Sequence, residues 1–422
     1  MTFSARRQRG FWVLAATLVT FFAASSVPTP LYLVYQAKWH FSAITLTLIF
    51  AVYAGALLLT LLTAGGLSDF LGRRRVLAGA LVVELLSMAA FIFADGVGWL
   101  LVARAVQGVA TGAAAGALSA GVADLAPPER PSLAAAVNTA APSTGLAIGA
   151  VTSGALVQYA PAPRVLVFAS LIVLFSALLL ALTVVPETVT RRGGSLRSLQ
   201  PRASVPVAAR GTFKAMAPVL IATWAVGGLV LSLGPSLAAG VFGITNHLVG
   251  GLVVTAVAGF GAAGSVLTRG WAPRPTMLHG AFVLIAGVGL VLGSLGTGWT
   301  ALFFSGLIVS GWGFGTAFVG SFGAVASIAT PQQRAELFAS LYVVSYLAFG
   351  GSAVLAGLAV PSYGLRPTAT VYGAIVIALS LAAAFAGLRQ RRISLPDADQ
   401  DEEQVRPEEV AKAAVRVPVA IR

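Results

Sequence analysis

The chain has 422 residues, of which 57% are hydrophobic and only 10% are charged, and its formal net charge is +13. A soluble domain is about 45–50% apolar and about 25% charged, so this composition excludes a water-soluble globular fold, and it excludes a disordered chain as well. The absence of cysteine excludes disulfide scaffolds, cysteine-ligated zinc and thiol nucleophiles. A membrane protein with many spans remains.

The apolar residues form long runs separated by short polar breaks. Each run is long enough for a helix to cross about 30 Å of hydrocarbon, and lipid leaves the backbone of an open strand unsatisfied. We therefore predict an all-α membrane protein with twelve transmembrane helices. The runs are residues 11–35, 43–64, 76–94, 98–123, 133–158, 165–186, 214–238, 248–268, 276–294, 298–322, 336–360 and 366–388.

The first of these runs contains two prolines and is preceded by three arginines. Pro28 and Pro30, like Pro235 in the seventh run, are expected to kink or end their helices. Three arginines precede the first run, as in a secretory signal peptide, but its apolar stretch is longer than a signal core. We expect it to remain as the first span.

The placement of basic residues predicts the orientation. Twelve spans put both termini on one side, and that side holds 23 of the 27 lysines and arginines. The other side holds Lys38, Arg164 and Arg366, and Arg104 lies within a span. Because basic loops stay inside, we expect a multi-pass protein of the cytoplasmic membrane with both termini in the cytoplasm. The net charge thus reports topology, and no nucleic acid partner is expected.

Two features divide the spans into six and six. The polar break at 187–213 is rich in Arg, Gly, Ser and Pro, which is typical of a flexible cytoplasmic linker. It separates two predicted bundles at 11–186 and 214–388; residues 1–10 form a cytoplasmic N-terminus, and residues 389–422, with equal numbers of acids and bases, a disordered cytoplasmic tail.

A weak internal repeat supports this division into two pseudo-symmetric six-helix bundles. The loop from Gly65 to Arg75 has a partial counterpart from Gly264 to Arg274, at an offset of 199 residues. The segment Pro127-Pro-Glu-Arg130 matches Pro331-Gln-Gln-Arg334 at an offset of 204 residues. Many secondary transporters consist of such duplicated units.

At these loops the chain resembles the major facilitator superfamily. The loop between the second and third spans contains that family's signature at Gly65, Asp69, Gly72, Arg73 and Arg74, with Phe70 in place of the usual basic residue. Arg104-Ala-Val-Gln107-Gly108 is similar to the fourth-helix signature of proton-coupled members. The segment from Gly145 to Gly154 is similar to the antiporter signature, although Ala150 replaces its proline. The resemblance implies the major facilitator fold and the twelve-helix drug:proton antiporter branch.

The signature loop is a candidate cytoplasmic gate. Gly65 and Gly72 are expected to permit a tight turn, with Arg73 and Arg74 following them. Asp69 can interact with a helix N-terminus, and the resemblance implies that this is the start of the eleventh helix. Asp124, at the end of the fourth span, is the expected partner of Arg73. Alternatively, the loop is only a basic topology anchor.

Two charged residues lie deep within spans, Glu84 and Arg104. Each costs about 2.5–3.5 kcal/mol at a helix centre, so both are candidates for proton or substrate coupling. Their depths differ by about 9 Å, and a direct salt bridge is therefore not expected. Glu84 could exchange a proton during transport, or it could serve only as a structural hydrogen-bonding group.

Small residues and mid-span polar residues complete the candidate sites. Glycines at four-residue spacing predict close helix packing, and polar or aromatic residues at mid-depth are candidates for the substrate cavity, although such aromatics also occur in interfacial belts. The packing candidates are Gly108, Gly112, Gly116, Gly145, Gly149 and Gly154. The cavity candidates are Tyr32, Gln107, Asn138, Trp224, Trp312 and Tyr346. The histidines are scattered, so no metal site is expected.

We predict a secondary active transporter that works by alternating access and carries out proton-coupled efflux of a small neutral or anionic amphipathic molecule. It is expected to be monomeric, to need no cofactor and not to be an enzyme, because catalytic groups do not cluster within the spans. The alternatives are a metabolite importer or facilitator of the same fold, and a membrane sensor that transports nothing. A channel is disfavoured because no segment resembles a selectivity filter.

Overall fold

The structure is a computed structural model that describes residues 3–130, 132–190, 203–328 and 333–390. Its regular elements in these ranges are all helical, and twelve stretches are long and apolar enough to span a membrane, which confirms the predicted fold class. The N-terminal half contains α1 (Phe3–Ser26), α2 (Pro28–Trp39), α3 (Ala43–Ala64), α4 (Ser68–Leu71), α5 (Arg73–Ile92), α6 (Val97–Leu125), α7 (Ser132–Tyr159), α8 (Pro163–Ala181) and the 3-10 turn η1 (Leu182–Val184). The C-terminal half contains η2 (Val207–Ala209), α10 (Arg210–Phe242), α11 (His247–Leu267), α12 (Pro273–Thr297), α13 (Thr300–Ile328), α14 (Arg334–Tyr363) and α15 (Leu365–Gln390).

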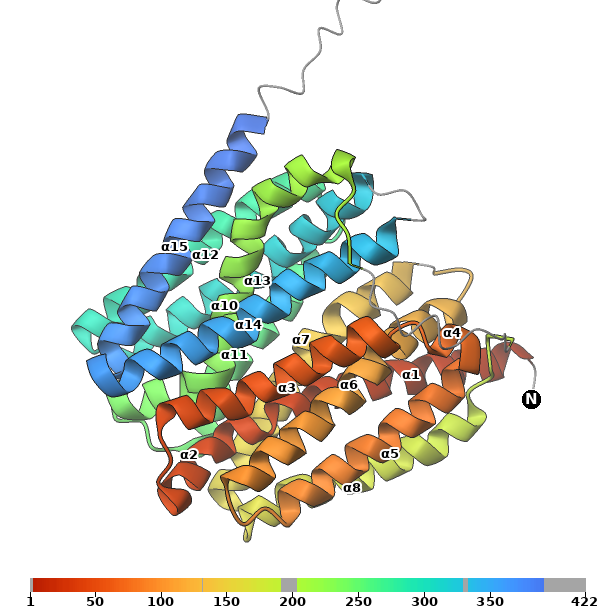
Figure 1. Cartoon of the computed structure of the whole chain (residues 1–422), viewed down its shortest axis with the longest axis horizontal. Helices are drawn as coiled ribbons and strands as arrows, with labels where there is room; N and C mark the ends of the chain where they lie inside the picture. The colour runs from red at the N-terminus through yellow and green to blue at the C-terminus, as the bar shows by residue number, and fades with distance from the viewer. Residues whose placement is uncertain (1–2, 131, 191–202, 329–332, 391–422) are drawn as a thin grey trace, which may run out of the picture.

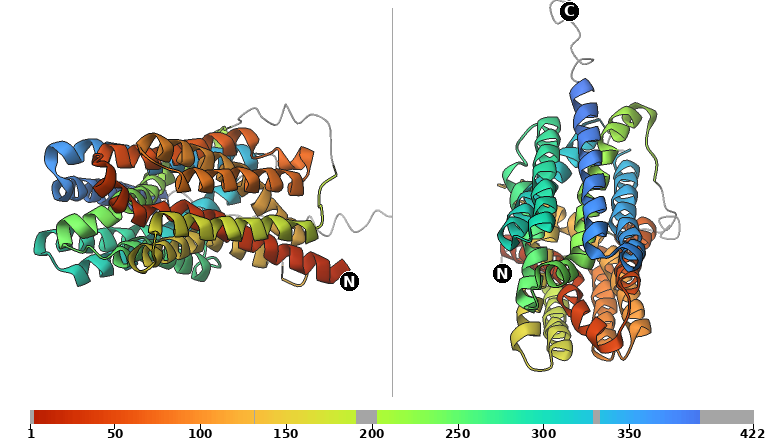
Figure 2. Two further views of the ribbon diagram at one scale, coloured as in Figure 1. Left: turned by 90° about the horizontal axis from the view of Figure 1, so that it is seen from below. Right: turned by 90° about the vertical axis from the view of Figure 1, so that its left-hand side faces the viewer.

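The helices form two groups that lie against each other along their length. Helices α1–α8 make the N-terminal bundle, and α10–α15 make the C-terminal bundle, seen in Figure 1 as the red-to-yellow and the green-to-blue halves. Their long axes run in roughly one direction (Figure 2). Between the bundles α7 packs against α11, and α3 packs against α14. Residues 191–202 of the predicted linker and residues 391–422 of the predicted tail lie outside the described residues.

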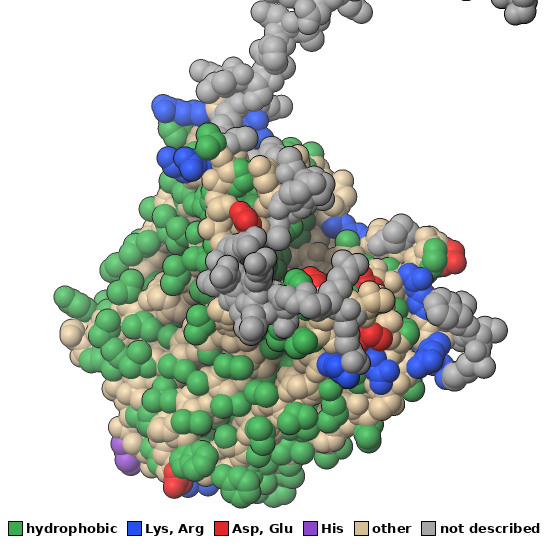
Figure 3. All heavy atoms as spheres, turned by 45° about the vertical axis from the view of Figure 1, so that its right-hand side comes forward, with side chains coloured by type: hydrophobic (Ala, Val, Ile, Leu, Met, Phe, Trp, Pro, Cys, Tyr) green, Lys and Arg blue, Asp and Glu red, His purple; other side chains and the backbone are tan. Residues whose placement is uncertain are grey.

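Charged side chains gather at one end of the helices. We call this the basic end and define it by Arg6, Arg73, Arg210, Arg274 and Arg389, which lie at helix ends or in the loops there. Figure 3 shows Lys and Arg side chains along this end, above a surface that is mainly hydrophobic. Large apolar side chains on that surface are exposed, such as Val173 at 70% and Leu355 at 69%, as expected for helices that face lipid. The other end is called the opposite end.

The prolines act differently in the first and seventh spans. As predicted, the first span is broken: α1 ends at Ser26 and α2 begins at Pro28. The expectation for Pro235 is only partly met, because α10 continues through it to Phe242. A proline deprives the carbonyl four residues earlier of its partner, here that of Leu231. The hydroxyl of Thr29 donates to that oxygen at 3.0 Å and so allows the helix to continue.

The glycine stripes lie where helices approach most closely. A Cβ on Gly108 or Gly112 would lie 2.5 Å from a backbone oxygen of α3, and Gly116 also faces that chain segment. Gly145 and Gly149 leave no room for a side chain against α1. Gly154 faces His247 and Gly251 of α11, so this residue lies between the bundles and not within one. The structure thus places all six glycines at close helix contacts, as small residues permit.

The compensation of Pro235 by Thr29 can be tested by a double-mutant cycle. Thr29→Val removes the donor at nearly constant shape and should lower the free energy of unfolding by about 1–2 kcal/mol, because Leu231 O is left unpaired in an apolar environment. In a Pro235→Ala background the new backbone N–H can bind that oxygen, so Thr29→Val should cost much less. Unfolding in detergent would be followed by circular dichroism. Equal losses in both backgrounds would contradict this role of Thr29.

Candidate functional site

A cavity of about 140 Å³ lies between the two bundles, near the middle of the spans. Helices α1, α3 and α7 form one wall, and α10, α11, α13 and α14 form the other. The lining side chains carry no formal charge. They are Phe22, Ser25, Tyr53, Asn138, Thr139, Pro142, Ser143, Leu146, Trp224, Leu231, Val257, Ala258, Phe314, Phe318, Tyr342, Tyr346 and Phe349, with Gly227.

The bundles touch on the opposite-end side of this cavity. The side chain of Gln158 accepts a hydrogen bond from the backbone N–H of His247 at 2.8 Å, and Thr255 donates to Ala147 O at 3.0 Å. Where α3 meets α14, the ring centroids of Phe50 and Phe349 lie 4.8 Å apart. These contacts lie in the halves of their helices nearest the opposite end, whereas Thr139 and Tyr342 of the cavity wall lie nearer the basic end. The cavity is therefore closed off towards the opposite end.

Aromatic rings dominate the C-terminal wall. The indole of Trp224 lies at the centre, with ring centroids of Tyr346 at 5.0 Å, Phe349 at 5.5 Å, Phe318 at 6.2 Å and Phe314 at 6.4 Å. Such rings present large apolar faces that can stack on a planar ligand or attract a cation. The wall thus suits an apolar or aromatic molecule.

Two buried polar atoms in the cavity wall have no hydrogen-bond partner among the described residues. One is the donor Nε1 of Trp224 in the C-terminal bundle, and the other is the acceptor Oδ1 of Asn138 in the N-terminal bundle. The amide nitrogen of Asn138 donates to Ser119 O at 2.9 Å, which orients its oxygen. Because buried polar groups normally find partners, these two atoms mark the places where a ligand would accept and donate hydrogen bonds.

A polar cluster lies behind the N-terminal wall and is entirely buried. We call it the Arg104 cluster; it consists of Glu84, Arg104, Gln107 and Tyr32. The guanidinium group donates to Tyr32 OH at 2.9 and 2.6 Å, to Gln107 Oε1 at 2.6 Å and to Ser25 O at 2.9 Å. Its Cζ atom also lies 5.2 Å from the ring centroid of Tyr53, which lines the cavity. The cluster therefore contacts the cavity wall from behind.

The broken first span explains why this cluster is where it is. Pro28 cannot donate to Ala24 O, and the end of α1 leaves further carbonyls without helical partners. Gln107 Nε2 donates to Ala24 O at 3.0 Å, Arg104 donates to Ser25 O, and Ser153 Oγ donates to Val27 O at 2.6 Å. A cation near a helix C-terminus is also favoured by the helix dipole. Arg104 and Gln107 thus complete the interrupted helix.

Among the residues that the structure describes, Gln107 links Glu84 to Arg104. Its Oε1 accepts from Gln107 Nε2 at 3.3 Å, and its Oε2 has no partner among the described residues. Within the described chain no ion pair joins Glu84 to Arg104; both side chains instead bind Gln107. From the carboxyl group, contacts run through Gln107 and Arg104 to Ser25, whose hydroxyl lies 2.6 Å from Tyr53 OH on the cavity wall.

The six cavity candidates from the sequence divide into three groups. Asn138, Trp224 and Tyr346 line the cavity. Tyr32 and Gln107 do not; they bind Arg104 behind the wall, so their assignment to the wall is corrected. Trp312 is corrected too, because its Nε1 donates to His279 Nε2 at 3.2 Å within the C-terminal bundle. Hydropathy reports how deep a residue lies but not which face of the helix carries it.

Sequence reasoning missed most of the aromatic wall. Tyr342, Tyr346 and Phe349 of α14 are spaced four and three residues apart, so they share one face of that helix. That spacing was a usable signal. Tyr53 and Ser25 carry no comparable signal, since they are marked only by their contact with the Arg104 cluster.

The candidate gate residues meet at the basic end of the N-terminal bundle. Arg73 pairs with Asp69 at 2.5 Å and with Asp124 at 3.0 Å, the partner expected for it. Gly72 has φ +96°, a conformation that favours glycine, and a Cβ there would lie 2.7 Å from Glu187 Oε2. Gly65 has an ordinary helical φ of −58°, but a Cβ there would clash with the backbone oxygen of Leu61, so this turn leaves no room for a side chain.

These gate contacts are all made within the N-terminal bundle. Glu187, which follows η1, accepts from the backbone N–H groups of Arg73 at 2.8 Å and Arg74 at 3.1 Å. Asp69 is 60% exposed, and no hydrogen bond or ion pair between described residues joins it to α14. The described residues therefore show no contact of Asp69 with the eleventh span; residues 329–332, just before α14, are not described.

Comparison with known proteins identifies the fold. The Major Facilitator Superfamily model matches residues 13–296, and no curated protein matches in sequence. The chain is similar to the human organic anion transporter MFSD10 (TETRAN), with 16% identity and a TM-score of 0.66 over 89% of this chain and 99% of that chain.

Two further solved structures are similar. One is a bacterial homolog of the human lysosomal transporter Spinster, inward-facing and unoccupied, with 14% identity and a TM-score of 0.73 over 93% of this chain and 99% of that chain. The other is the nucleoside transporter NupG, with 13% identity and a TM-score of 0.67 over 90% of this chain and 99% of that chain. At these identities the likeness is one of fold.

The role of Arg104 in completing the first span predicts a large effect on stability. Arg104→Gln removes the donors to Ser25 O and Tyr32 and should lower the free energy of unfolding by about 3 kcal/mol, because several buried groups lose their partners. Arg104→Lys keeps the charge but not the planar fork and should lose an intermediate amount. Arg269→Gln, at an exposed position, is the control. Arg104→Gln matching that control in denaturant unfolding would refute the role.

Proposed function

The chain belongs to the Major Facilitator Superfamily, and within that family we propose that it is a proton-coupled exporter of a small amphipathic molecule. Members of the family are secondary transporters and not enzymes, so a transported small molecule follows from membership. The proposal adds the substrate chemistry, the coupling ion and the direction. It also places both termini in the cytoplasm, because the basic end carries the arginine-rich loops.

The observation that carries the proposal is the cavity shared by both bundles. Its walls carry aromatic rings and no formal charge, and Trp224 Nε1 and Asn138 Oδ1 find no hydrogen-bond partner in the described part of the chain. A substrate that fits this wall is uncharged and largely apolar, with one hydrogen-bond acceptor and one donor. Arg104 lies behind the wall, which favours a neutral molecule over the anion that an exposed arginine would attract.

The position of the contacts between the bundles supports alternating access. The bundles touch on the opposite-end side of the cavity, and the gate residues at the basic end pair within their own bundle. With the basic end in the cytoplasm, this is a conformation that loads substrate from inside the cell. Rocking of the bundles would then open the opposite end.

Glu84 is the proposed proton carrier. It is fully buried in a membrane span, and one of its carboxyl oxygens has no partner among the described residues. An ionisable group at such a depth is a functional candidate by default. Its contacts through Gln107 and Arg104 reach Ser25 and Tyr53, so a change in the charge of Glu84 can alter the hydrogen bonds at the cavity wall.

Transport in reconstituted vesicles tests this function. Compounds that raise the melting temperature of the purified protein would be selected first, since a bound ligand stabilises the folded state. Wild-type protein should then move such a compound against its gradient when a pH gradient is applied. Glu84→Gln should abolish gradient-driven accumulation, while exchange of labelled for unlabelled compound continues.

Trp224→Phe is the matched comparison, because it keeps an aromatic ring at this position but removes the Nε1 donor. It should weaken binding about tenfold, the loss of one hydrogen bond at a buried site, and leave the dependence on the pH gradient unchanged. If the wild type only equilibrates the compound, the protein is a facilitator. If Glu84→Gln transports like wild type, Glu84 is not the proton carrier, and binding without any flux would indicate a sensor.

A further inference from the structure

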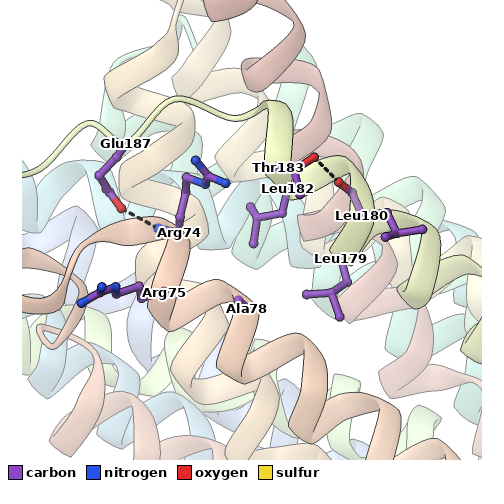
Figure 4. Close-up of a pocket in the computed structure, with 8 residues that line it drawn as sticks. All are labelled: Arg74, Arg75, Ala78, Leu179, Leu180, Leu182, Thr183 and Glu187. Atoms are coloured by element: carbon purple, nitrogen blue, oxygen red, sulfur yellow. Dashed lines mark hydrogen bonds between the residues drawn. The ribbon is translucent and has the colours of Figure 1, made fainter.

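A second hollow lies far from the central cavity, on the outer surface of the N-terminal bundle at the basic end. It is an open groove of about 570 Å³ between the first turns of α5 and the end of α8 (Figure 4). Arg74, Arg75 and Ala78 line one side, and Leu179, Leu180 and Leu182 line the other. No residue lines both this groove and the central cavity.

The two arginines of the groove differ from their neighbour Arg73. Arg73 is occupied by Asp69 and Asp124. The guanidinium groups of Arg74 and Arg75 take part in no ion pair or hydrogen bond with the described residues. In Figure 4 the Arg74 side chain lies between Glu187 and Leu182, and Arg75 extends from the other side of the α5 turn. Both charges are thus available to a ligand.

The one acidic side chain that lines the groove, Glu187, is already occupied by backbone hydrogen-bond donors. Glu187 accepts from the N–H groups of Arg73 at 2.8 Å, Arg74 at 3.1 Å and Thr188 at 3.2 Å. The start of α5 is therefore capped, and a helix N-terminus is not what would attract an anion here. The net charge of the lining remains positive, which complements a phosphate group.

The other side of the groove is apolar and continuous with the lipid-facing surface. Leu180 is 71% exposed, and exposed apolar residues such as Val82 and Leu86 of α5 and Val173 of α8 continue along the same two helices. The groove thus combines a cationic end at the basic face with apolar side chains that extend towards the membrane interior. A phospholipid has this same order of charge and hydrocarbon.

We propose that this groove binds one anionic phospholipid, with its phosphate on Arg74 and Arg75 and an acyl chain along Leu179 and Leu180. Arginine binds phosphate through paired N–H groups, and basic residues at a membrane surface attract anionic lipid. The site belongs to the outer wall of the N-terminal bundle and is independent of the transported molecule.

Native mass spectrometry of the full chain in detergent tests the proposal. Phosphatidylglycerol and phosphatidylcholine would be titrated separately, and the first bound phosphatidylglycerol should bind about tenfold more tightly, as expected for a charge-assisted contact. Arg74→Gln/Arg75→Gln should remove this preference. Arg130→Gln/Arg269→Gln removes two exposed arginines at the same end and should keep it.

Circular dichroism and the melting temperature without lipid would establish that each variant is folded. Arg75→Gln alone, at an exposed position, should lower the preference even if the double variant fails to fold. Equal binding of the two lipids to wild type, or an unchanged preference in Arg75→Gln, would overturn the proposal. So would displacement of phosphatidylglycerol by glycerol 1-phosphate at equal concentration, because the site would then bind a soluble phosphate.

Discussion

The break in the first span at Pro28 determines much of the interior. In lipid every backbone polar group must find a partner within the protein, and the break leaves the carbonyls of Ala24 and Ser25 without helical donors. Gln107 and Arg104 supply them, and Ser153 adds a donor to Val27 O at the start of α2. A charged residue buried in the fourth span therefore has a structural reason to be there, and the same contacts place it behind the wall of the central cavity.

The same constraint connects the two bundles. Thr29, directly after the break, donates to Leu231 O, which Pro235 leaves free in the other bundle. Small residues then let α7 and α11 approach, as Gly154 and Gly251 show. The interrupted first span and the proline-containing helix α10 thus meet beside the cavity.

Much of this architecture could be predicted from the sequence, because hydrocarbon thickness dictates the length and composition of a span. The broken first span and the pairing of Arg73 with Asp124 could also be predicted, from the prolines and from the ends of neighbouring spans. The continuation of α10 through Pro235 could not be predicted, because Thr29, which donates to the free carbonyl of Leu231, lies 202 residues away from it in the sequence. Trp312 and Gln107 were misplaced because nearly uniform hydropathy hides which face of a helix points to the cavity. The capping of α5 by Glu187 could not be predicted either, because Glu187 lies 113 and 114 residues from the N–H groups that it accepts from.

The central claim is that the two bundles alternate in exposing the shared cavity. Because the chain has no cysteine, pairs of spin labels can be introduced without background, at Ser132 and Arg269 near the basic end and at Tyr159 and Trp299 near the opposite end. Pulsed electron–electron double resonance would measure both label-to-label distances, with and without a stabilising ligand and at two pH values. The account predicts that the first distance shortens as the second lengthens. Distances that stay constant, or that change in the same sense at both ends, would contradict it.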